Sequence, residues 1–338
     1  MKQSAHMSEE RLLVILSGFK KKKIAVFGDV GIDRYTTGLV ERISPEAPVP
    51  IVSVQSEYLK LGLASNVADN VIALTGEAYL TGVLGDDQDA KDLTTMLSLR
   101  KIGTSGLVTD ATRRTILKER IMGEHQQMLR VDYENTHPLS PAIQKKVQAS
   151  ALKMITNADA LIIEDYAKGL LDEKTIAIAI KAAQAKKIPI LVDPHLKSPV
   201  NWYSHATLLT PNKREAEVLS GQKILDQKSL HEVGQVIMKK SRSHSLVITL
   251  GKDGMAIFKN SKTQPTVIPT FAQEVYDVSG AGDTVIATMA LVLSTGATLE
   301  EAAFVSNLAA GVEVSKRGTA TVSQQEIVQA FLRQQSGH

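Results

Sequence analysis

The stretch Asp277-Val278-Ser279-Gly280-Ala281-Gly282-Asp283-Thr284 is the most informative part of this 338-residue sequence. It leads into the apolar run Ala281–Ser294, which predicts a helix. The small residues let the backbone approach a ligand, and a helix beginning here would direct N–H groups at an anion. A carboxylate is a poor phosphate ligand, so Asp283 is better explained as a base that deprotonates an attacking hydroxyl group. The alternative is an ordinary helix cap.

Around this stretch, short apolar runs alternate with segments of helical periodicity. The predicted strands are Ile24–Gly28, Ala78–Leu84, Ala160–Ile163, Ile188–Val192, Leu208–Thr210 and Leu246–Leu250. The predicted helices include Ala64–Leu74, Gln88–Arg100, Glu173–Lys186, Lys213–Leu219 and Leu299–Ser315. Such alternation predicts an α/β fold, in which a mostly parallel, doubly wound sheet is covered by helices on both faces.

Two strand-like segments, Pro48–Leu61 and Thr115–Asp132, lack partner helices and break the alternation. They predict a small antiparallel β lid that projects from the main body. No Pro- or Ser-rich linker divides the chain. We therefore expect one domain over residues 23–338, with lid strands at about 36–61 and 113–132, after an N-terminal segment of residues 1–22. The opening seven residues are given no functional role.

The composition argues against several classes of protein. The chain has no Cys, which excludes disulfides, thiolate catalysis and Cys-ligated metals. Its net charge is only +3, and no basic run is interleaved with aromatic residues, so nucleic acid is not an expected partner. No apolar run reaches the ~18 residues of a membrane span, and no signal peptide opens the sequence. We expect a cytoplasmic protein with no membrane partner.

Three further motifs follow predicted strands. Asn212-Lys213-Arg214-Glu215 is an N-x-x-E element, for which a capping pattern at a helix start is the simpler reading. Thr249-Leu250-Gly251-Lys252-Asp253-Gly254 would also suit a hairpin turn. Gly28–Asp33 is rich in Asp and would also suit an ordinary turn. Walker-type G-x-x-x-x-G-K-[ST] and dinucleotide G-x-G-x-x-G motifs are absent, so a phosphate site here is of another kind.

In this order along the chain, these motifs resemble those of the ribokinase-like (PfkB) carbohydrate kinases, over roughly residues 23–322. The resemblance implies a ribokinase-like fold that uses ATP and Mg²⁺. It implies that Gly280, Ala281 and Gly282 donate N–H groups to an anion hole for the transferring phosphoryl group. Asp283 is then the catalytic base that deprotonates the sugar hydroxyl.

The same resemblance implies the nucleotide and sugar sites. Asn212 and Glu215 would hold Mg²⁺ through water, and Thr249, Gly251 and Gly254 would contact ATP. The sugar contacts implied by the resemblance are Asp29, Asp33, Gly62 and Asn66. The last two belong to Gly62–Ala68, which resembles the family's G-G-x-x-x-N-x-A element with Leu63 in place of the second glycine.

Other strings indicate a narrower class of acceptor. Glu41–Pro50 (ERISPEAPVP), residues 126–132 (QQMLRVD) and Asp165–Gly169 (DYAKG) are similar to strings of bacterial D-glycero-β-D-manno-heptose-7-phosphate kinases. This resemblance implies a single-function kinase that phosphorylates the anomeric O1 of the heptose 7-phosphate. The product would be the 1,7-bisphosphate used in lipopolysaccharide core synthesis. The alternatives are another acceptor, such as fructose phosphate, ribose or a nucleoside, and an inactive sugar sensor on the same fold.

A sugar phosphate also requires cations in the pocket. Lys118, Arg120 and Arg130 lie in the predicted lid strands, and the first two share a strand face at a period of two. We expect them to bind the substrate phosphate, although a solvated strand face is the simpler alternative for each alone. Asp165, at a predicted strand end, is a candidate contact to Mg²⁺ through water or to the sugar. Exposed sheet edges tend to be covered, so the lid also predicts a homodimer.

Overall fold

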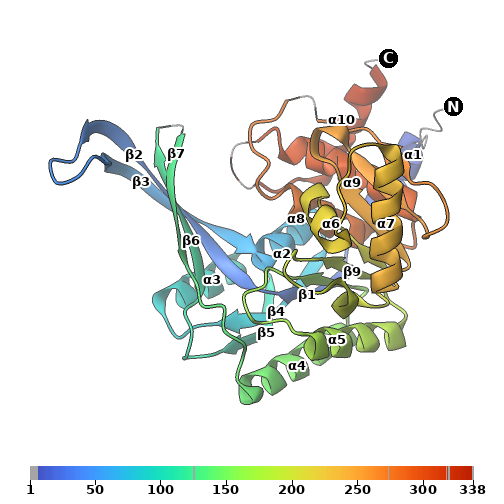
Figure 1. The fold of residues 1–338 in the computed structure, drawn as a ribbon, viewed down its shortest axis with the longest axis horizontal. Coiled ribbons are helices and arrows are strands. Elements are labelled where there is room, and N and C mark those ends of the chain that lie inside the picture. The colour runs from blue at the N-terminus through green and yellow to red at the C-terminus, as the bar shows by residue number, and fades with distance from the viewer. Residues whose placement is uncertain (1–6, 125, 273, 317, 319, 337–338) are drawn as a thin grey trace.

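The computed structural model describes residues 7–124, 126–272, 274–316, 318 and 320–336. Nearly all of the opening seven-residue segment therefore lies outside the described residues. Helices cover both faces of a central sheet, and a second, smaller sheet extends away from this body (Figure 1). None of the described helices is long and apolar enough to cross a membrane.

The central sheet has nine strands in the order β13-β12-β11-β10-β9-β8-β1-β4-β5. Neighbours from β5 to β11 are parallel, whereas β12 and β13 continue the sheet antiparallel at one edge. The strands are β1 (Lys23–Gly28), β4 (Glu77–Leu84), β5 (Gly103–Thr109), β8 (Ala160–Glu164), β9 (Ile190–Asp193), β10 (Leu208–Leu209), β11 (Ser245–Thr249), β12 (Met255–Phe258) and β13 (Thr266–Ile268). The predicted fold class is confirmed.

Strand β1 shows why this sheet is buried on both faces. Ile24 and Val26 pack into one hydrophobic core, while the alternate residues Ala25 and Phe27 pack into a second core on the other side. All four are at most 2 % exposed. A strand between two helical layers requires this continuous apolar sequence rather than a polar–apolar alternation.

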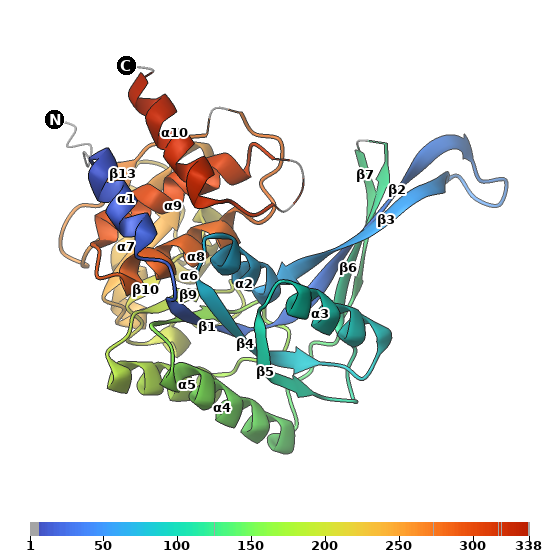
Figure 2. The ribbon, with the colours of Figure 1, turned by 180° about the vertical axis from the view of Figure 1, so that it is seen from behind.

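Each core has its own set of helices (Figures 1 and 2). The first core includes residues of α1 (Glu9–Ser17), α2 (Ala64–Ala73), α3 (Gln88–Leu99), α8 (Ala281–Ser294), α9 (Leu299–Glu313) and α10 (Gln324–Ser336). The second includes residues of α4 (Pro141–Thr156), α5 (Glu173–Lys186), α6 (Lys213–Ser220) and α7 (Gln227–Ser241). Short 3-10 turns, η1 (Val200–Tyr203) and η2 (Gly251–Asp253), complete the body.

The smaller sheet, here called the lid, has the strand order β3-β2-β6-β7. Its strands are β2 (Val30–Ile43), β3 (Pro50–Leu63), β6 (Ile116–Gly123) and β7 (Gln126–Tyr133). The two outer pairs are antiparallel, as predicted, and the central pair β2–β6 is parallel. Strand β2 begins at Val30, earlier than the predicted residue 36, because Val30 and Ile32 are buried and extend the strand into the body. Asp33 therefore lies in a lid strand and not in a turn.

We expect Gly234→Ala to destabilise the body, because α7 packs directly on β12 at this position. A Cβ on Gly234 would lie 2.2 Å from Cε1 of Phe258. The overpacking penalty of about 1–3 kcal/mol outweighs the gain of about 1 kcal/mol that Ala brings inside a helix. Urea unfolding should show a lower midpoint than wild type, whereas Lys239→Ala, on the exposed side of α7, should not lower it. A more stable Gly234→Ala protein would contradict this packing.

Candidate active site

The candidate active site lies where the winding of the central sheet reverses. Strand β1 has β4 on one side and β8 on the other, and ligands of doubly wound sheets bind at such a point, beyond the carboxyl ends of the strands. Asp29 follows β1, Asp165 follows β8, and Asp193 ends β9. Helix α8 packs against β8 and β9, and its first turn brings Asp283 near Asp193 and near Glu164, the last residue of β8.

Asp283 is held by two hydrogen bonds from different parts of the fold. Asn66 of α2 donates its side-chain N–H to Oδ2 at 2.6 Å, and the hydroxyl of Tyr166, after β8, donates to Oδ1 at 3.0 Å. Burial raises the pKa of Asp283 to about 6, while these two hydrogen bonds and Lys118 oppose the rise. A carboxylate with this pKa is ionised at neutral pH and basic enough to accept a hydroxyl proton.

The glycines before Asp283 shape the start of α8. Gly280 is the N-cap residue with φ 96°, a conformation that favours glycine. The N–H of Ala281 reaches the carbonyl of Val278 at 3.4 Å, whereas Gly282 and Asp283 belong to the first turn, whose N–H groups have no partner within a helix. A Cβ on Gly282 would lie 3.8 Å from Oδ2 of Asp193. The first turn of α8 and Asp193 therefore face a common space.

Three further carboxylates repel one another near Asp283. Glu164 and Asp193 are opposite residues on β8 and β9, and burial together with the neighbouring negative charges raises the pKa of both. Burial also raises the pKa of Glu215. Oxygen donors that carry this excess of negative charge fit a hydrated Mg²⁺ ion. In the described part of the chain, no group of three or more Asp, Glu, His or Cys side chains converges to hold a metal directly.

Asn212 and Glu215 form the capping box of α6. The Asn212 side chain accepts from the Glu215 N–H at 3.0 Å, and the Glu215 carboxylate accepts from the Asn212 N–H at 2.8 Å. The capping reading of this element therefore holds, and the charge of Glu215 also contributes to raising the pKa of Glu164 and Asp193. Thr249 pairs with Asn212 through an isolated parallel bridge, so the N-x-x-E and T-x-G-x-x-G elements lie side by side.

The two glycines after Thr249 differ in their surroundings. A Cβ on Gly254 would lie 2.0 Å from the carbonyl oxygen of Ile268, so this glycine is required by the turn into β12. Gly251 has φ 61° and nothing within 4 Å of the equivalent position. Gly251 therefore leaves open space at the surface beside Thr249, where a nucleotide can be accommodated.

Two rows of side chains cross the lid face that looks toward Asp283. In each row the residues lie opposite one another on β3, β2, β6 and β7: Lys60, Asp33, Lys118 and Asp132 in one, and Tyr58, Tyr35, Arg120 and Arg130 in the other. Lys118 places Nζ 5.4 Å from the ring centre of Tyr166, the residue that donates to Asp283. The shared face of Lys118 and Arg120, predicted from their spacing, is thus directed to the site.

The other predicted lid and sugar residues are held in defined ways. Arg120 forms an ion pair with the buried Asp33 at 2.8 Å. A Cβ on Gly62 would lie 3.2 Å from the carboxyl carbon of Asp33, so the glycine makes room for this carboxylate. Arg130 pairs with Asp132 at 2.8 Å and has half of its side chain exposed. Of the three cations predicted to bind phosphate, Arg130 is thus the most accessible, and it lies on the edge strand β7, beyond Lys118 and Arg120 on β6.

Asp29 and Asp165 are engaged by protein groups. Asp29 accepts from the backbone N–H groups of Tyr166 and Lys168, both at 3.2 Å, and burial and the charge of Asp165 raise its pKa to about 7. Asp165 accepts from the hydroxyl of the buried Tyr203 at 2.7 Å and from the Ala167 N–H at 2.7 Å. Both carboxylates thereby fix the loop that carries Tyr166.

Leu63 occupies a position that suits glycine better. As the N-cap of α2 it has φ 56° and ψ −141°, and its side chain is 6 % exposed. Backbone strain of this kind costs about 1–3 kcal/mol and persists only where packing enforces it. Burial of the leucine side chain supplies that packing at the junction between β3 and α2.

Sequence reasoning assigned no role to Tyr166, Glu164 or Lys60, although all three border the site. Tyr166 belongs to the string Asp165–Gly169 that pointed to the acceptor, and Glu164 directly precedes that string, so their position at the end of β8 was a usable signal. Lys60 could be found only once the register of β3 with β2 was known, because its partner Asp33 is 27 positions away in the sequence.

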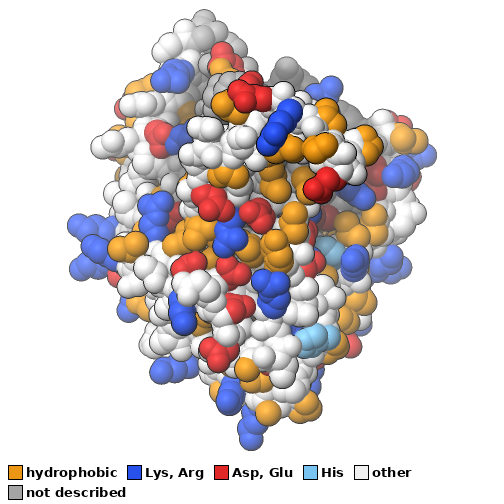
Figure 3. All heavy atoms as spheres, turned by 90° about the vertical axis from the view of Figure 1, so that its left-hand side faces the viewer, with side chains coloured by type: hydrophobic (Ala, Val, Ile, Leu, Met, Phe, Trp, Pro, Cys, Tyr) orange, Lys and Arg blue, Asp and Glu red, His pale blue; other side chains and the backbone are white. Residues whose placement is uncertain are grey.

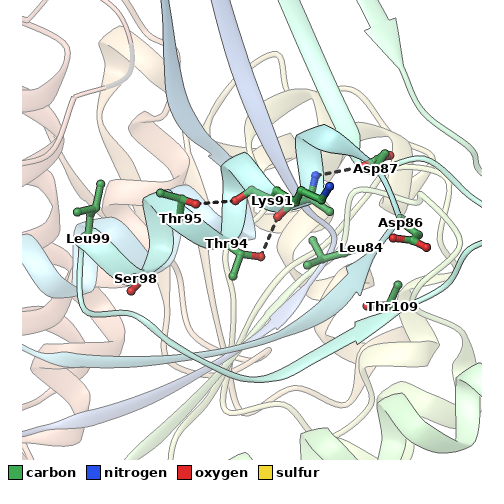
Figure 4. A pocket seen from close by; sticks show the side chains of 11 residues that line it. Leu84, Asp86, Asp87, Lys91, Thr94, Thr95, Ser98, Leu99 and Thr109 are labelled. Carbon is green, nitrogen blue, oxygen red and sulfur yellow. Dashed lines mark hydrogen bonds between the residues drawn. The ribbon is translucent and has the colours of Figure 1, made fainter.

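A groove of about 590 Å³ on the flank of the body is separate from this site (Figure 4). It is lined by residues of α3 and by the ends of β4 and β5. Two of its hydroxyl groups are already used by the helix, since Thr94 and Thr95 donate to the carbonyls of Ala90 and Lys91. The groove shares no residue with the cluster around Asp283.

Comparison with known proteins supports this description. Residues 21–326 match the pfkB family carbohydrate kinase profile. The chain belongs to the pfkB family of carbohydrate kinases. It is an ATP-dependent sugar kinase, and the family match covers both the lid and the Asp283 site.

Individual relatives of this kinase are similar over almost its whole length. It is 40% identical over 324 residues to the bifunctional protein HldE of Pelobacter propionicus, covering 96% of this chain and 66% of the relative. It is 42% identical over 307 residues to the bifunctional protein HldE of Helicobacter pylori (strain HPAG1), covering 90% and 65%. The chain thus spans about two thirds of the length of these curated relatives.

Solved structures share the fold at low sequence identity. A putative ribokinase from Agrobacterium tumefaciens has a TM-score of 0.77 with 21% identity, covering 94% of this chain and 99% of that one. Phosphofructokinase-2 from Escherichia coli, in complex with potassium, has a TM-score of 0.76 with 18% identity, covering 93% and 99%. The ribokinase-like fold expected from the sequence is confirmed.

We expect activity to depend on an ionised Asp283. Because the pKa of this group is raised to about 6, kcat/KM should be level above that pH and fall about tenfold per pH unit below it. Asp283→Asn should lower turnover by about 10²–10⁴-fold and leave ATP affinity near wild type. A pH–rate profile and calorimetric titration of ATP would measure the two effects.

A stability control accompanies this variant. An unfolded Asp ionises near pH ~3.9, so the folded protein, with a pKa of about 6, binds more protons in between and loses stability as pH rises through this range. Asparagine removes that loss, so the unfolding temperature of Asp283→Asn should not be lower at neutral pH. Retained turnover in a folded variant would exclude Asp283 as the base.

Proposed function

We propose that this kinase transfers the γ-phosphoryl group of ATP to the anomeric O1 of D-glycero-β-D-manno-heptose 7-phosphate, giving the 1,7-bisphosphate for lipopolysaccharide core synthesis. The observation that carries the proposal is the position of Lys118 and Arg120 on the lid face directed to Asp283. Cations there can bind a phosphate on the acceptor while O1 lies at the base. The three strings that resemble those of heptose-7-phosphate kinases support this choice of acceptor. Because ATP is the phosphoryl donor, we propose that the reaction takes place in the cytoplasm.

In the proposed mechanism, the acceptor lies between the lid and the body. Asn66 and Tyr166 keep the Asp283 carboxylate oriented, and Asp283 takes the O1 proton as the hydroxyl attacks. The N–H groups at the start of α8 stabilise the negative charge on the transferring phosphoryl group. The lid excludes water, so that ATP is not hydrolysed. In this proposal Asp33 and Asn66 contact sugar hydroxyls, and Gly62 makes room for Asp33. Asp29 is a further proposed sugar contact.

The nucleotide is proposed to lie across the start of α6 and the turn after β11. Thr249 and Gly251 are the proposed contacts to ATP, and Gly254 shapes the turn. Asn212 and Glu215 would hold Mg²⁺ through water, with Asp193 and Glu164 facing the same space. The ion, when bound, neutralises phosphate charge. Asp165 would act mainly by holding the Tyr166 loop.

We also propose that two copies associate through their lids. Exposed hydrophobic side chains are frequent on the lid strands: Leu39, Val40, Ile43, Val54, Tyr58, Met128 and Leu129. Figure 3 views the molecule from this side and shows hydrophobic patches between charged groups. The edges of the lid sheet are β3 and β7, which offer unpaired backbone groups to a partner. A homodimer would cover both the exposed hydrophobic side chains and an edge strand of the lid.

The acceptor proposal predicts a specific defect in Lys118→Met. Loss of a charged hydrogen bond to the substrate phosphate, about 1.5–3 kcal/mol, should raise KM for heptose 7-phosphate by about 10–100-fold. ADP release would be measured with heptose 7-phosphate, fructose 6-phosphate, fructose 1-phosphate, ribose and adenosine. Lys153→Met, on the exposed face of α4, is the matched control.

Comparison of these five acceptors tests the acceptor and the kinase chemistry separately. Preference of the wild type for the heptose phosphate supports it, and preference for another sugar contradicts the acceptor while keeping the kinase chemistry. Binding of a sugar without ADP release would indicate a sensor. Because Lys118 lowers the pKa of Asp283, the acid limb of kcat/KM should also move to higher pH in Lys118→Met.

The lid dimer is tested by placing a charge on its apolar residues. Val54→Asp and Leu129→Asp, which alter side chains that are 58% and 55% exposed, should shift the protein from dimer to monomer in sedimentation velocity. Leu99→Asp changes an even more exposed leucine on α3 and should leave the dimer intact. A monomeric wild-type protein at micromolar concentration would exclude this assembly.

A further inference from the structure

The polar contacts between α2 and α8 extend beyond the hydrogen bond from Asn66 to Asp283. Asn70 lies about one turn after Asn66 on α2, and its side chain contacts both helices. Its amide N–H donates to the carbonyl oxygen of Asn66 at 3.0 Å, and its amide oxygen accepts from the hydroxyl of Thr284 at 2.9 Å. Asn70 therefore joins the residue that orients Asp283 to the residue that follows Asp283.

Asn70 and Thr284 lie deep inside the body. They are 1 % and 0 % exposed, and their chain neighbours Val71 and Val285 belong to the first hydrophobic core. The amide and the hydroxyl satisfy each other there. An apolar pair of the same shape would support the fold about as well, because a buried hydrogen bond replaces bonds to water. Stability alone therefore does not explain a polar pair at this place.

The direction of the hydrogen bonds gives the pair a role that apolar packing cannot supply. Every residue of α2 from Ala64 to Val71 is buried, but hydrophobic burial is non-directional and does not select one rotation of the helix. A hydrogen bond requires a donor–acceptor distance of about 2.7–3.2 Å and a nearly linear arrangement. Two bonds to α8, from positions about one turn apart on α2, therefore restrict how the two helices can sit against each other.

The start of α2 is held separately. The N–H of Ala64 donates to the carbonyl of Asp29, the residue after β1, at 3.0 Å. The contact between Asn70 and Thr284 holds the helix on the other side of Asn66. Asn66 thus lies between two fixed points, and its amide is carried to Asp283 at 2.6 Å by a helix that is anchored on both sides.

We propose that Asn70 and Thr284 are positioning residues for phosphoryl transfer, which set α2 against α8 so that the Asn66 amide meets the Asp283 carboxylate. Both side chains act through Asn66 and Asp283, and neither is a contact to the acceptor or to ATP. The inference rests on the proposed role of Asp283 as the base, and it does not depend on which sugar is the acceptor.

Thr284→Val tests this role, because it removes the hydroxyl and keeps the shape of the side chain. We expect kcat to fall by about 10–100-fold, the effect of a small misplacement in an active site, with little change in the acceptor KM. Thr284→Ser keeps the hydroxyl and should keep most of the turnover. Because the Asn66 hydrogen bond lowers the pKa of Asp283, the acid limb of kcat/KM should move to higher pH in Thr284→Val.

A double-mutant cycle with Asn70→Leu shows whether the two residues act together. The double variant should fall no further than the worse single variant. Thr288→Val is the matched control on α8. The Thr288 hydroxyl is equally buried but donates to the Thr284 carbonyl of its own helix at 2.7 Å, so its loss should leave kcat at the wild-type value.

Carboxyl ¹³C NMR of labelled Asp, with Asp283→Asn to assign the signal, follows the same group without turnover. The pKa of Asp283, about 6 in wild type, should be higher in Thr284→Val. A folded Thr284→Val protein with wild-type kcat and an unshifted pKa would overturn the proposal, as would additive losses in the cycle or an equal loss in Thr288→Val.

Two further outcomes are distinguishable. If Asn70→Leu unfolds, the comparison of Thr284→Val with Thr284→Ser decides the proposal. If the wild-type protein turns over no acceptor, the proposed function fails, whereas the NMR titration still shows whether Thr284 positions Asn66 against Asp283.

Discussion

The two hydrogen bonds to Asp283 are the constraint on which the rest of the site depends. One donor, Asn66, belongs to a helix that follows the lid, and the other, Tyr166, belongs to the loop after β8. Asp283 itself comes from α8, more than 100 residues further along the chain. Three separate segments must therefore reach their final positions before the Asp283 carboxylate is oriented. The central sheet makes this possible by ending β1, β8 and β9 at one edge.

The buried carboxylates at this edge of the sheet repel one another, which lowers the stability of the fold. Glu164 and Asp193 face each other on adjacent strands, Glu215 and Asp283 lie close by, and burial raises the pKa of every member of the set. Such a cluster opposes folding unless protons or a cation reduce its charge. In the proposed mechanism, its position beside the start of α8 would let a hydrated divalent ion lie between the protein and the ATP phosphates. For Asp283 itself, burial and the charge of Asp33 raise the pKa.

The sequence predicted what depends on local pattern. The apolar runs of the parallel strands, the limits of α5 and α8, and the loop before Asp283 all follow from short-range periodicity and small residues. The capping box of Asn212 and Glu215 was visible in the same way. Long-range register was not visible: Asp33 was placed before the lid, and Lys60 was assigned nothing, because only pairing between β2 and β3 brings these two together. The hydrogen bonds that engage Asp29 and Asp165 likewise depend on how the Tyr166 loop folds back onto β1.

The lid supplies positive charge next to the carboxylates of the body. Around Asp283 the body contributes mainly carboxylates, whereas the facing lid strands contribute Lys60, Lys118 and Arg120. The carboxylates of the body repel anions, whereas the lid cations can attract a phosphate group but lie apart from Asp283 in the fold. In the proposed mechanism, a lid displaced from the body would leave both half-sites incomplete, and ATP on the body would then meet no activated hydroxyl. The proposed function therefore requires the lid to dock on the body, because the two sheets contribute opposite charges to one site.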